Sequence, residues 1–226
     1  VYMQSSQIYM FRTLCEELSS FIELEGLVVR PYGRETLPYF QRMTTDQQDG
    51  AIRNLQSYIH ICKSVYEDGG VLRDSAFFLH KALSFYGYDY EGKALENLKN
   101  DELAEFYSYE HTPLFRNLSY FENASYTLED IYSRPWIHLY DRDPKIGEAL
   151  GQHLERFYEG TRDVIYVDVP EHILTERASL EKLKSKVKVR AIVPLQKEGK
   201  NDAYLVLAGC QPQHPWGETD SMPNKL

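Results

Sequence analysis

The side chains that could catalyse a reaction are few in this sequence and widely spaced. His138, His153 and His172 are dispersed, and none has a nucleophile or carboxylate at a spacing typical of a catalytic group. The motifs GxSxG, HExxH, GxxxxGK[ST] and GxGxxG are absent from the chain. We therefore interpret each histidine as a surface residue or a hydrogen-bonded core residue, and we predict a protein that is not an enzyme.

The residues that could bind a metal or a redox cofactor are also poorly grouped. Asp141, Asp143 and Glu148 could surround a cation, but a loop that ends in an Asp helix cap explains them better. The three cysteines are odd in number and far apart, namely Cys15, Cys62 and Cys210. They have neither disulfide nor metal-ligand spacing, which favours a reducing cytoplasm and predicts no cofactor and no metal.

Composition excludes several classes of partner. The chain has 226 residues, 42% of them hydrophobic, and a formal net charge of −9. This charge argues against a nucleic-acid surface, because phosphate binding requires clustered Lys and Arg. The single basic run, residues 182–188, is interpreted as a solvated helix face. A signal peptide and an apolar stretch of about 18 residues are both absent, so we predict no membrane partner and a cytoplasmic location.

Residues 1–70 are predicted to form a helical region. A heptad-like apolar stripe runs along the first helix at Ile8, Phe11, Cys15, Leu18 and Ile22. A second helix is predicted to follow a capping box at residues 45–48 and to end near residues 68–70. Two such helices can form a homodimer, or they can pack on the domain that follows; the sequence leaves both open.

The middle of the chain alternates helices and short strands. A helix is predicted over residues 71–88, then a hairpin with strands at 102–109 and 114–121, then a short strand at 136–140. Asp143 followed by Pro144 is a strong start signal for another helix, which Gly160 ends.

The last third is predicted as a strand at residues 164–169, an amphipathic helix at 171–188, and a hairpin with strands at 189–195 and 203–208. Every residue from 204 to 208 is apolar, which is typical of a central strand covered on both faces. Another helix is expected to begin near Gly217. The fold class is therefore α+β: an antiparallel sheet of five to six strands flanked by helices, preceded by the helical region.

Residues 71–226 resemble a GAF domain. The segments that carry this resemblance are VIYVDV (164–169), VRAIVPL (189–195), AYLVL (203–207) and HPW (214–216), although Ala203 stands where the family usually has glycine. Residues 126–136 are in turn similar to a helical segment of PAS domains, which share the sheet architecture and a sensing role.

The resemblance implies a cavity between the sheet and the helices on one face, which could hold a nucleotide or another small molecule. It points to ligand-binding candidates on successive strands, namely Tyr107, Tyr109, His138, Tyr140, Tyr166, Asp168 and Arg190. Bilin attachment and methionine-sulfoxide reduction are disfavoured, because both need cysteines in that cavity. Here two cysteines precede the domain, and Cys210 is expected to follow the last strand.

Two functions are compatible with this sequence. The first is a non-catalytic sensory module of a cytoplasmic signalling protein, which passes its signal through dimeric helices to an output domain outside this chain. The alternative is an interaction or dimerisation module whose pocket is plugged by large aromatic side chains, namely Phe106, Tyr107, Tyr109, Trp136 and Tyr140. An open or a filled cavity distinguishes them.

Overall fold

The structure is a computed structural model that describes residues 2–33 and 39–213. Its helices are α1 (Tyr2–Leu24), α2 (Thr45–Glu67), α3 (Ser75–Tyr86), α4 (Leu118–Glu122), α5 (Leu128–Ser133) and α6 (Pro144–Tyr158), with 3-10 turns η1 (Phe40–Arg42) and η2 (Trp136–His138). Its strands are β1 (Asp89–Tyr90), β2 (Glu102–Ser108), β3 (Pro113–Arg116), β4 (Tyr140–Asp141), β5 (Ile165–Tyr166), β6 (His172–Glu176), β7 (Lys184–Lys197) and β8 (Lys200–Gln213). The helix expected near Gly217 lies outside the described residues.

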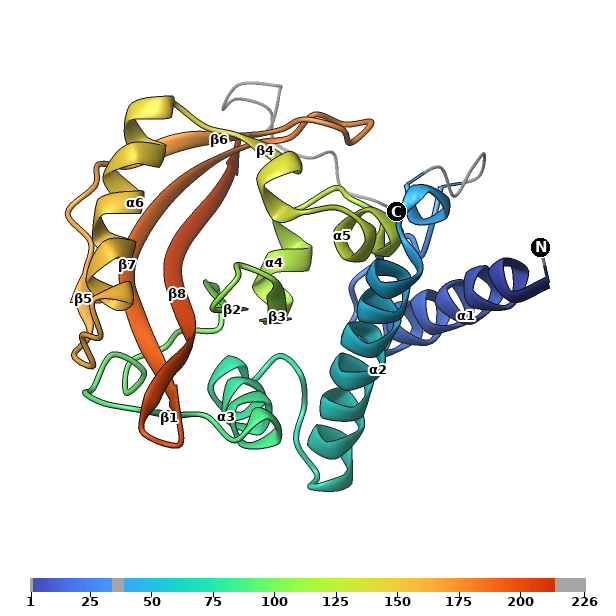
Figure 1. Cartoon of the computed structure of the whole chain (residues 1–226), viewed down its shortest axis with the longest axis horizontal. Helices are drawn as coiled ribbons and strands as arrows, with labels where there is room; N and C mark the ends of the chain where they lie inside the picture. The colour runs from blue at the N-terminus through green and yellow to red at the C-terminus, as the bar shows by residue number, and fades with distance from the viewer. Residues whose placement is uncertain (1, 34–38, 214–226) are drawn as a thin grey trace, which may run out of the picture.

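All strands belong to one curled antiparallel sheet, as the sequence predicts. Its main path has the order β3-β2-β8-β7-β6-β4, and β1 and β5 pair with β7 beside β6. The long β7–β8 hairpin lies at the centre, and α6 and the α1–α2 pair lie at opposite sides of the molecule (Figure 1). The α+β class and the central hairpin are therefore confirmed.

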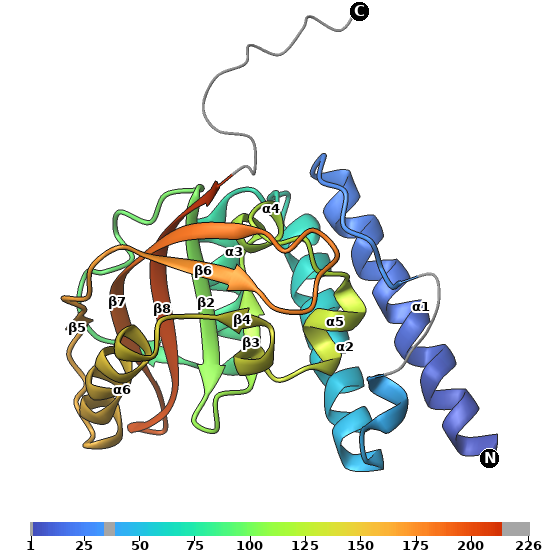
Figure 2. The same cartoon turned by 90° about the horizontal axis from the view of Figure 1, so that it is seen from above.

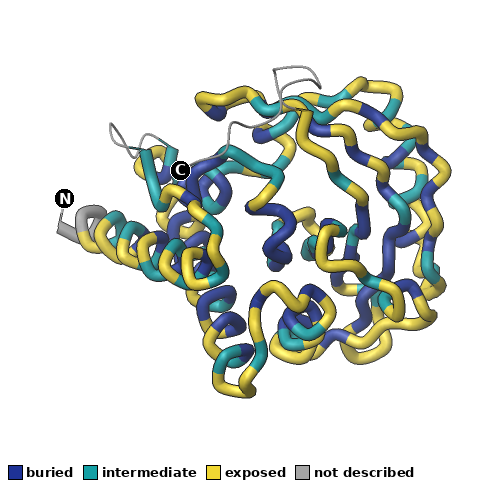
Figure 3. Tube along the Cα trace, turned by 180° about the vertical axis from the view of Figure 1, so that it is seen from behind, coloured by how far each residue is buried: buried dark blue, intermediate teal, exposed yellow. Residues whose placement is uncertain are grey.

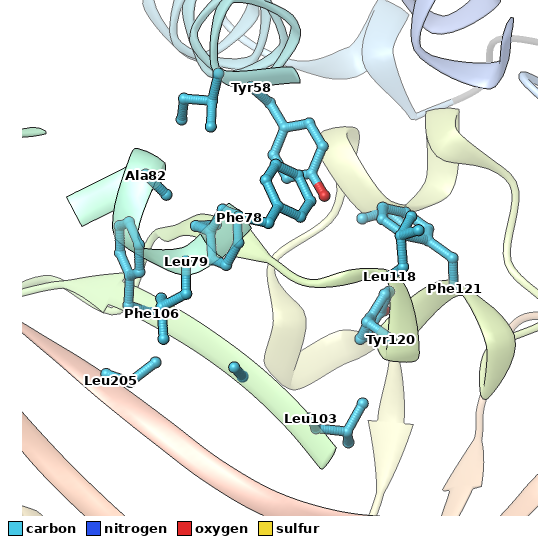
Figure 4. Packing of buried hydrophobic residues seen from close by; sticks show 14 of the residues in the cluster. Tyr58, Phe78, Leu79, Ala82, Leu103, Phe106, Leu118, Tyr120, Phe121 and Leu205 are labelled. Carbon is cyan, nitrogen blue, oxygen red and sulfur yellow. The ribbon is translucent and has the colours of Figure 1, made fainter. Parts of the chain in front are cut away.

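The two faces of the sheet are covered by different helices (Figure 2). Phe106 of β2 and Leu205 of β8 are register partners on the α3 face, where Phe115 stacks on Phe106 and meets the ring of Phe78 edge-on (Figure 4). The alternate residues of β2 and β8 point to α6. Because strand side chains alternate between faces, an all-apolar strand requires cover on both sides, and β8 has it.

The helical region packs into the same core as the sheet. Four of the five stripe residues are fully buried where α1 lies against α2, namely Phe11, Cys15, Leu18 and Ile22, and Ile8 is partly buried. Tyr58 of α2 packs against Phe78, as Figure 4 shows, and against Phe115. Buried residues of α2 and of the sheet belong to one cluster, so the core continues across residue 70; Figure 3 shows buried residues in both parts. Among residues 2–33 and 39–213, no helix combines the length and the apolar character needed to cross a bilayer.

The prediction of a helix at residues 171–188 is wrong. This segment forms β6, an irregular turn and the first part of β7. The buried carboxylate of Glu176 accepts hydrogen bonds from the amide N–H groups of Ser125 (2.7 Å) and Leu183 (3.2 Å), which organises the turn. In β7 the buried residues alternate with exposed lysines from Lys184 onwards, a period of two that fits a strand.

Smaller corrections concern element ends. The strand predicted at 136–140 is the η2 turn followed by the two-residue β4, and the strand at 164–169 is limited to β5. The second arm of the predicted hairpin stops at Arg116, after which α4 begins. The capping box of α2 starts one residue earlier than predicted, at Thr44, whose side chain accepts from the N–H of Gln47.

Candidate ligand-binding cavity

A cavity of about 480 Å³ lies between α6 and the sheet. Its volume is within the range of small-molecule sites in proteins. The walls are mainly aliphatic and come from β2, α6, β6, β7 and β8, namely Leu103, Leu150, Leu154, Leu174, Val187, Val189, Ile192, Val206 and Ala208. The site is thus built on regular elements, with α6 as its cover.

The helical periodicity of α6 creates part of this space. On α6 the lining residues Gly147, Leu150, Gly151 and Leu154 recur at three and four, so they share one helix face. Gly147 and Gly151 leave room, because a Cβ added at either position would meet no heavy atom within 4 Å. The glycines of α6 therefore keep part of the cavity open.

A buried ion pair forms the polar part of the wall. Glu105 of β2 and Arg116 of β3 are register partners, and their side chains are 15% and 6% exposed. Arg116 Nε lies 2.8 Å from Glu105 Oε2, and the same oxygen accepts a hydrogen bond from the hydroxyl of Tyr107 at 3.0 Å. This carboxylate is therefore charge-compensated inside the protein.

Two further tyrosines extend the polar wall. The Tyr140 hydroxyl donates to the Tyr120 hydroxyl at 2.9 Å, and the Arg116 guanidinium lies 4.3 Å from the centre of the Tyr120 ring. Burial raises the pKa of Tyr120 to about 12 and holds the pKa values of Tyr107 and Tyr140 well above the ordinary value. All three remain neutral phenols at physiological pH.

Two hydrogen-bond donors in the cavity wall have no acceptor among the described residues. Within the described part of the chain, Arg142 Nε and Trp136 Nε1 are buried and have no hydrogen-bond partner. Burial lowers the pKa of Arg142, and no carboxylate of the described residues forms an ion pair with it. Buried N–H groups without partners are uncommon in folded proteins, so each of these two groups is a candidate to donate to an acceptor on a ligand.

Two of the seven residues proposed from the sequence line this cavity. Tyr107 lies on β2 and Tyr140 on β4, and both contribute to its polar side. The phenol ring of Tyr107 also lies 5.9 Å from the Trp136 ring. The sequence points to Tyr107 through the GAF resemblance. In the structure it shares its face of β2 with Leu103 and Glu105, because strand side chains alternate between faces.

The other five proposed residues lie elsewhere. Tyr109 packs on Phe157 and Tyr158, His138 is an exposed residue of η2, and Tyr166 and Asp168 point to solvent. Arg190 is on the opposite face of β7, where its Nε lies 2.6 Å from Glu102 Oε1 and its Nη atoms lie 3.4 Å from the Ala94 carbonyl oxygen. The structure does not bring these five together.

The position expected for Cys210 is also wrong. It lies within β8 and lines the cavity, whereas the sequence places it after the last strand. Burial raises the pKa of its thiol to about 11, so it is a protonated, weakly nucleophilic group. Among the described residues, no three His, Cys, Asp or Glu side chains are grouped so that they could hold a metal ion.

A second hollow of about 750 Å³ lies between the start of α2, the β2–β3 turn and the end of α5. The exposed Arg42 and Arg53 form part of its rim. It shares Arg116 and His111 with the α6 cavity. We place the candidate site in the α6 cavity, where the walls are more apolar and the two unused donors lie.

Comparison with known proteins found no matching protein-family model, no similar curated protein and no similar solved structure. The function is therefore inferred from the cavity itself.

Proposed function

We propose that this protein is a non-catalytic sensory module, of GAF or PAS type, that binds a small molecule in the cavity between α6 and the sheet. One observation carries the proposal: the space remains about 480 Å³ although Tyr107, Trp136 and Tyr140 all contribute to its wall. Phe106 points to α3, away from this space. A plugged pocket, the basis of the alternative function, is therefore disfavoured.

The contacts of Arg116 connect the cavity wall to the helical region. Its side chain belongs to the cavity wall, and its main-chain carbonyl accepts a hydrogen bond from the buried Tyr58 of α2. A ligand that shifts the Glu105–Arg116 pair changes the end of β3, and this change reaches α2 directly. In the proposed role, α1 and α2 transmit the signal to an output domain of a cytoplasmic signalling protein outside this chain.

Filling the cavity tests the proposal. A thermal-shift screen of nucleotides, metabolites and small organic acids identifies compounds that stabilise the chain. We expect Gly151→Leu to abolish that shift, because the new side chain occupies the space over α6 where a Cβ meets nothing. Gly151→Ala is the matched control and should keep binding. The proposal fails if no compound stabilises the chain, or if Gly151→Leu binds as the natural chain does.

Dimerisation is a second candidate, supported by the outward side of α1. The stripe predicted for dimer contact is buried, but Met10 is 44% exposed and Leu24 is 74% exposed on the other side of the helix. A second copy could cover this side. Light scattering at micromolar concentration should then give a dimer for the natural chain and a monomer for Leu24→Lys. Tyr166→Lys is the control, because Tyr166 is 65% exposed on β5, on the opposite side of the molecule from α1. A monomeric natural chain removes this candidate.

A further inference from the structure

We infer that the cavity ligand is an organic carboxylate with an apolar tail, with its carboxylate held by Arg142 and Trp136. This inference rests on the proposed function, because it requires that the α6 cavity binds a small molecule at all. It adds the chemical class of that molecule and the two residues that recognise it.

The charge balance of the cavity favours an anion. Glu105 is compensated by Arg116 at 2.8 Å, which leaves Arg142 as an additional cation in the wall. Arg177 also contributes to the wall, but it is half exposed and is paired with Asp141 at 2.8 Å. A ligand with one negative charge would compensate the charge that Arg142 adds. A cationic ligand would add to it.

The unused hydrogen-bond groups point to an acceptor. Arg142 Nε and Trp136 Nε1 are both donors, and neither an arginine nor an indole can accept a hydrogen bond. A carboxylate offers two acceptor oxygens and binds arginine strongly. The hydroxyl of Tyr107 donates to Glu105, and its oxygen accepts from neither Arg142 Nε nor Trp136 Nε1.

The rest of the wall favours an apolar tail over a nucleotide. Away from Arg142 and Trp136, the lining is aliphatic over β7, β8 and α6, with residues such as Val189, Val206 and Leu154. A nucleotide would bring a sugar and several phosphate charges. The wall offers a single arginine without an acidic partner, which matches one carboxylate better than a chain of phosphates.

Three probe compounds distinguish the contribution of the carboxylate from that of the apolar tail. Isothermal titration calorimetry compares decanoate, below its micelle concentration, with decan-1-ol and acetate. Decanoate carries both features, decan-1-ol lacks the charge, and acetate lacks the tail. We expect decanoate to bind at least about tenfold more tightly than decan-1-ol, since a hydrogen bond to a charged group is worth more than a neutral one. Acetate should show no binding.

Variants assign the carboxylate to its two donors. Arg142→Gln should weaken decanoate binding by at least about tenfold and leave decan-1-ol unchanged, which also verifies that the variant is folded. Trp136→Phe keeps the ring, removes the N–H group, and should weaken decanoate by about threefold to tenfold. Arg177→Gln is the matched control, because Arg177 lines the same cavity but has an acidic partner, and it should change decanoate binding less than twofold.

The outcomes distinguish this inference from the proposed function. If decan-1-ol binds as tightly as decanoate, or if Arg142→Gln keeps decanoate affinity, the carboxylate assignment is wrong while ligand binding stands. If a nucleotide binds and decanoate does not, the class is wrong and the sensory function stands. If none of the probes and none of the screened compounds binds, both fail.

Discussion

At the scale of single residues, the Glu105–Arg116 pair is the most buried ion pair in the described part of the chain. Arg116→Met should destabilise the fold by about 3–5 kcal/mol, because it leaves the carboxylate of Glu105 buried without its cation. Urea denaturation measures the difference. Arg30→Met is the control: Arg30 and Glu181 form a pair in which both side chains are 46% exposed, and its loss should cost less than about 1 kcal/mol. If Arg116→Met and Arg30→Met destabilised the fold equally, burial would not explain the contribution of the Glu105–Arg116 pair.

Glu129 of α5 should make stability depend on pH. The residue is 5% exposed and its Oε1 has no partner among the described residues. Burial raises its pKa from 4.5 to about 7, against the opposing effect of Arg12. The native state therefore holds this proton more tightly than the unfolded state. The stability that the proton contributes is complete below pH 4.5, and it is lost as pH rises through 7.

The test compares the free energy of unfolding of Glu129→Gln with that of the natural chain across a range of pH. We expect the variant to gain stability relative to the natural chain between pH 5 and pH 8, by at most about 3 kcal/mol, because it cannot ionise. The exposed Glu155 of α6 supplies the control: Glu155→Gln measures the effect of the same carboxyl-to-amide change at an exposed position. If the stability difference between Glu129→Gln and the natural chain did not change with pH, this carboxyl would be solvated.

Part of the cavity could be predicted from the sequence. The GAF resemblance points to Tyr107, and the period of two along β2 puts Glu105 on the same face, two residues earlier. Trp136 and Arg142 lie on either side of the two-residue β4, in a segment without a repeating pattern. Their orientation depends on tertiary contacts with β2 and β6, which no local spacing reveals.

At the scale of elements, α6 depends on its first turn. The Asp143 side chain accepts a hydrogen bond from the N–H of Lys145 at 2.9 Å, and Pro144 follows directly. Asp143→Ala should cost about 1 kcal/mol in the free energy of unfolding, because the first turn loses its cap. Asp143→Asn keeps a side-chain acceptor and should lower the free energy of unfolding by only a few tenths of a kcal/mol. Equal effects of the two substitutions would argue against a capping role.

The contrast between α6 and residues 171–188 shows when local sequence suffices. The start of α6 has Asp and Pro at adjacent positions, a signal that needs no distant partner. The 171–188 segment carries apolar residues at spacings that suit a helix. Its conformation is instead set by pairing with β8 and by the Glu176 carboxylate, which joins it to Ser125. Tertiary pairing outweighs local preference there.

At the scale of the whole molecule, the helices and the sheet should unfold together. Tyr58 of α2 packs between α3 and β3 and donates to the Arg116 carbonyl, and α1 packs on α2. We expect circular dichroism and tryptophan fluorescence to report one coincident urea transition. A fragment of residues 71–213 should lack this transition, because it exposes the apolar face that α2 covers. Two separate transitions would instead indicate two independent domains, as the predicted boundary at residue 70 implies.

The two edges of β7 differ in a way that bears on how a molecule could reach the cavity. One edge pairs with β8 along its whole length, whereas the other is divided among β6, β5 and β1. After α6 the chain rejoins this edge through the two residues of β5, Ile165 and Tyr166, and through the N–H group of Val167, which donates to the Arg190 carbonyl. Local opening there leaves the β7–β8 ladder intact, so a ligand can enter without global unfolding. Hydrogen exchange should show it: the amides of β5 exchange much faster than those that join β7 to β8, and a bound ligand slows the former.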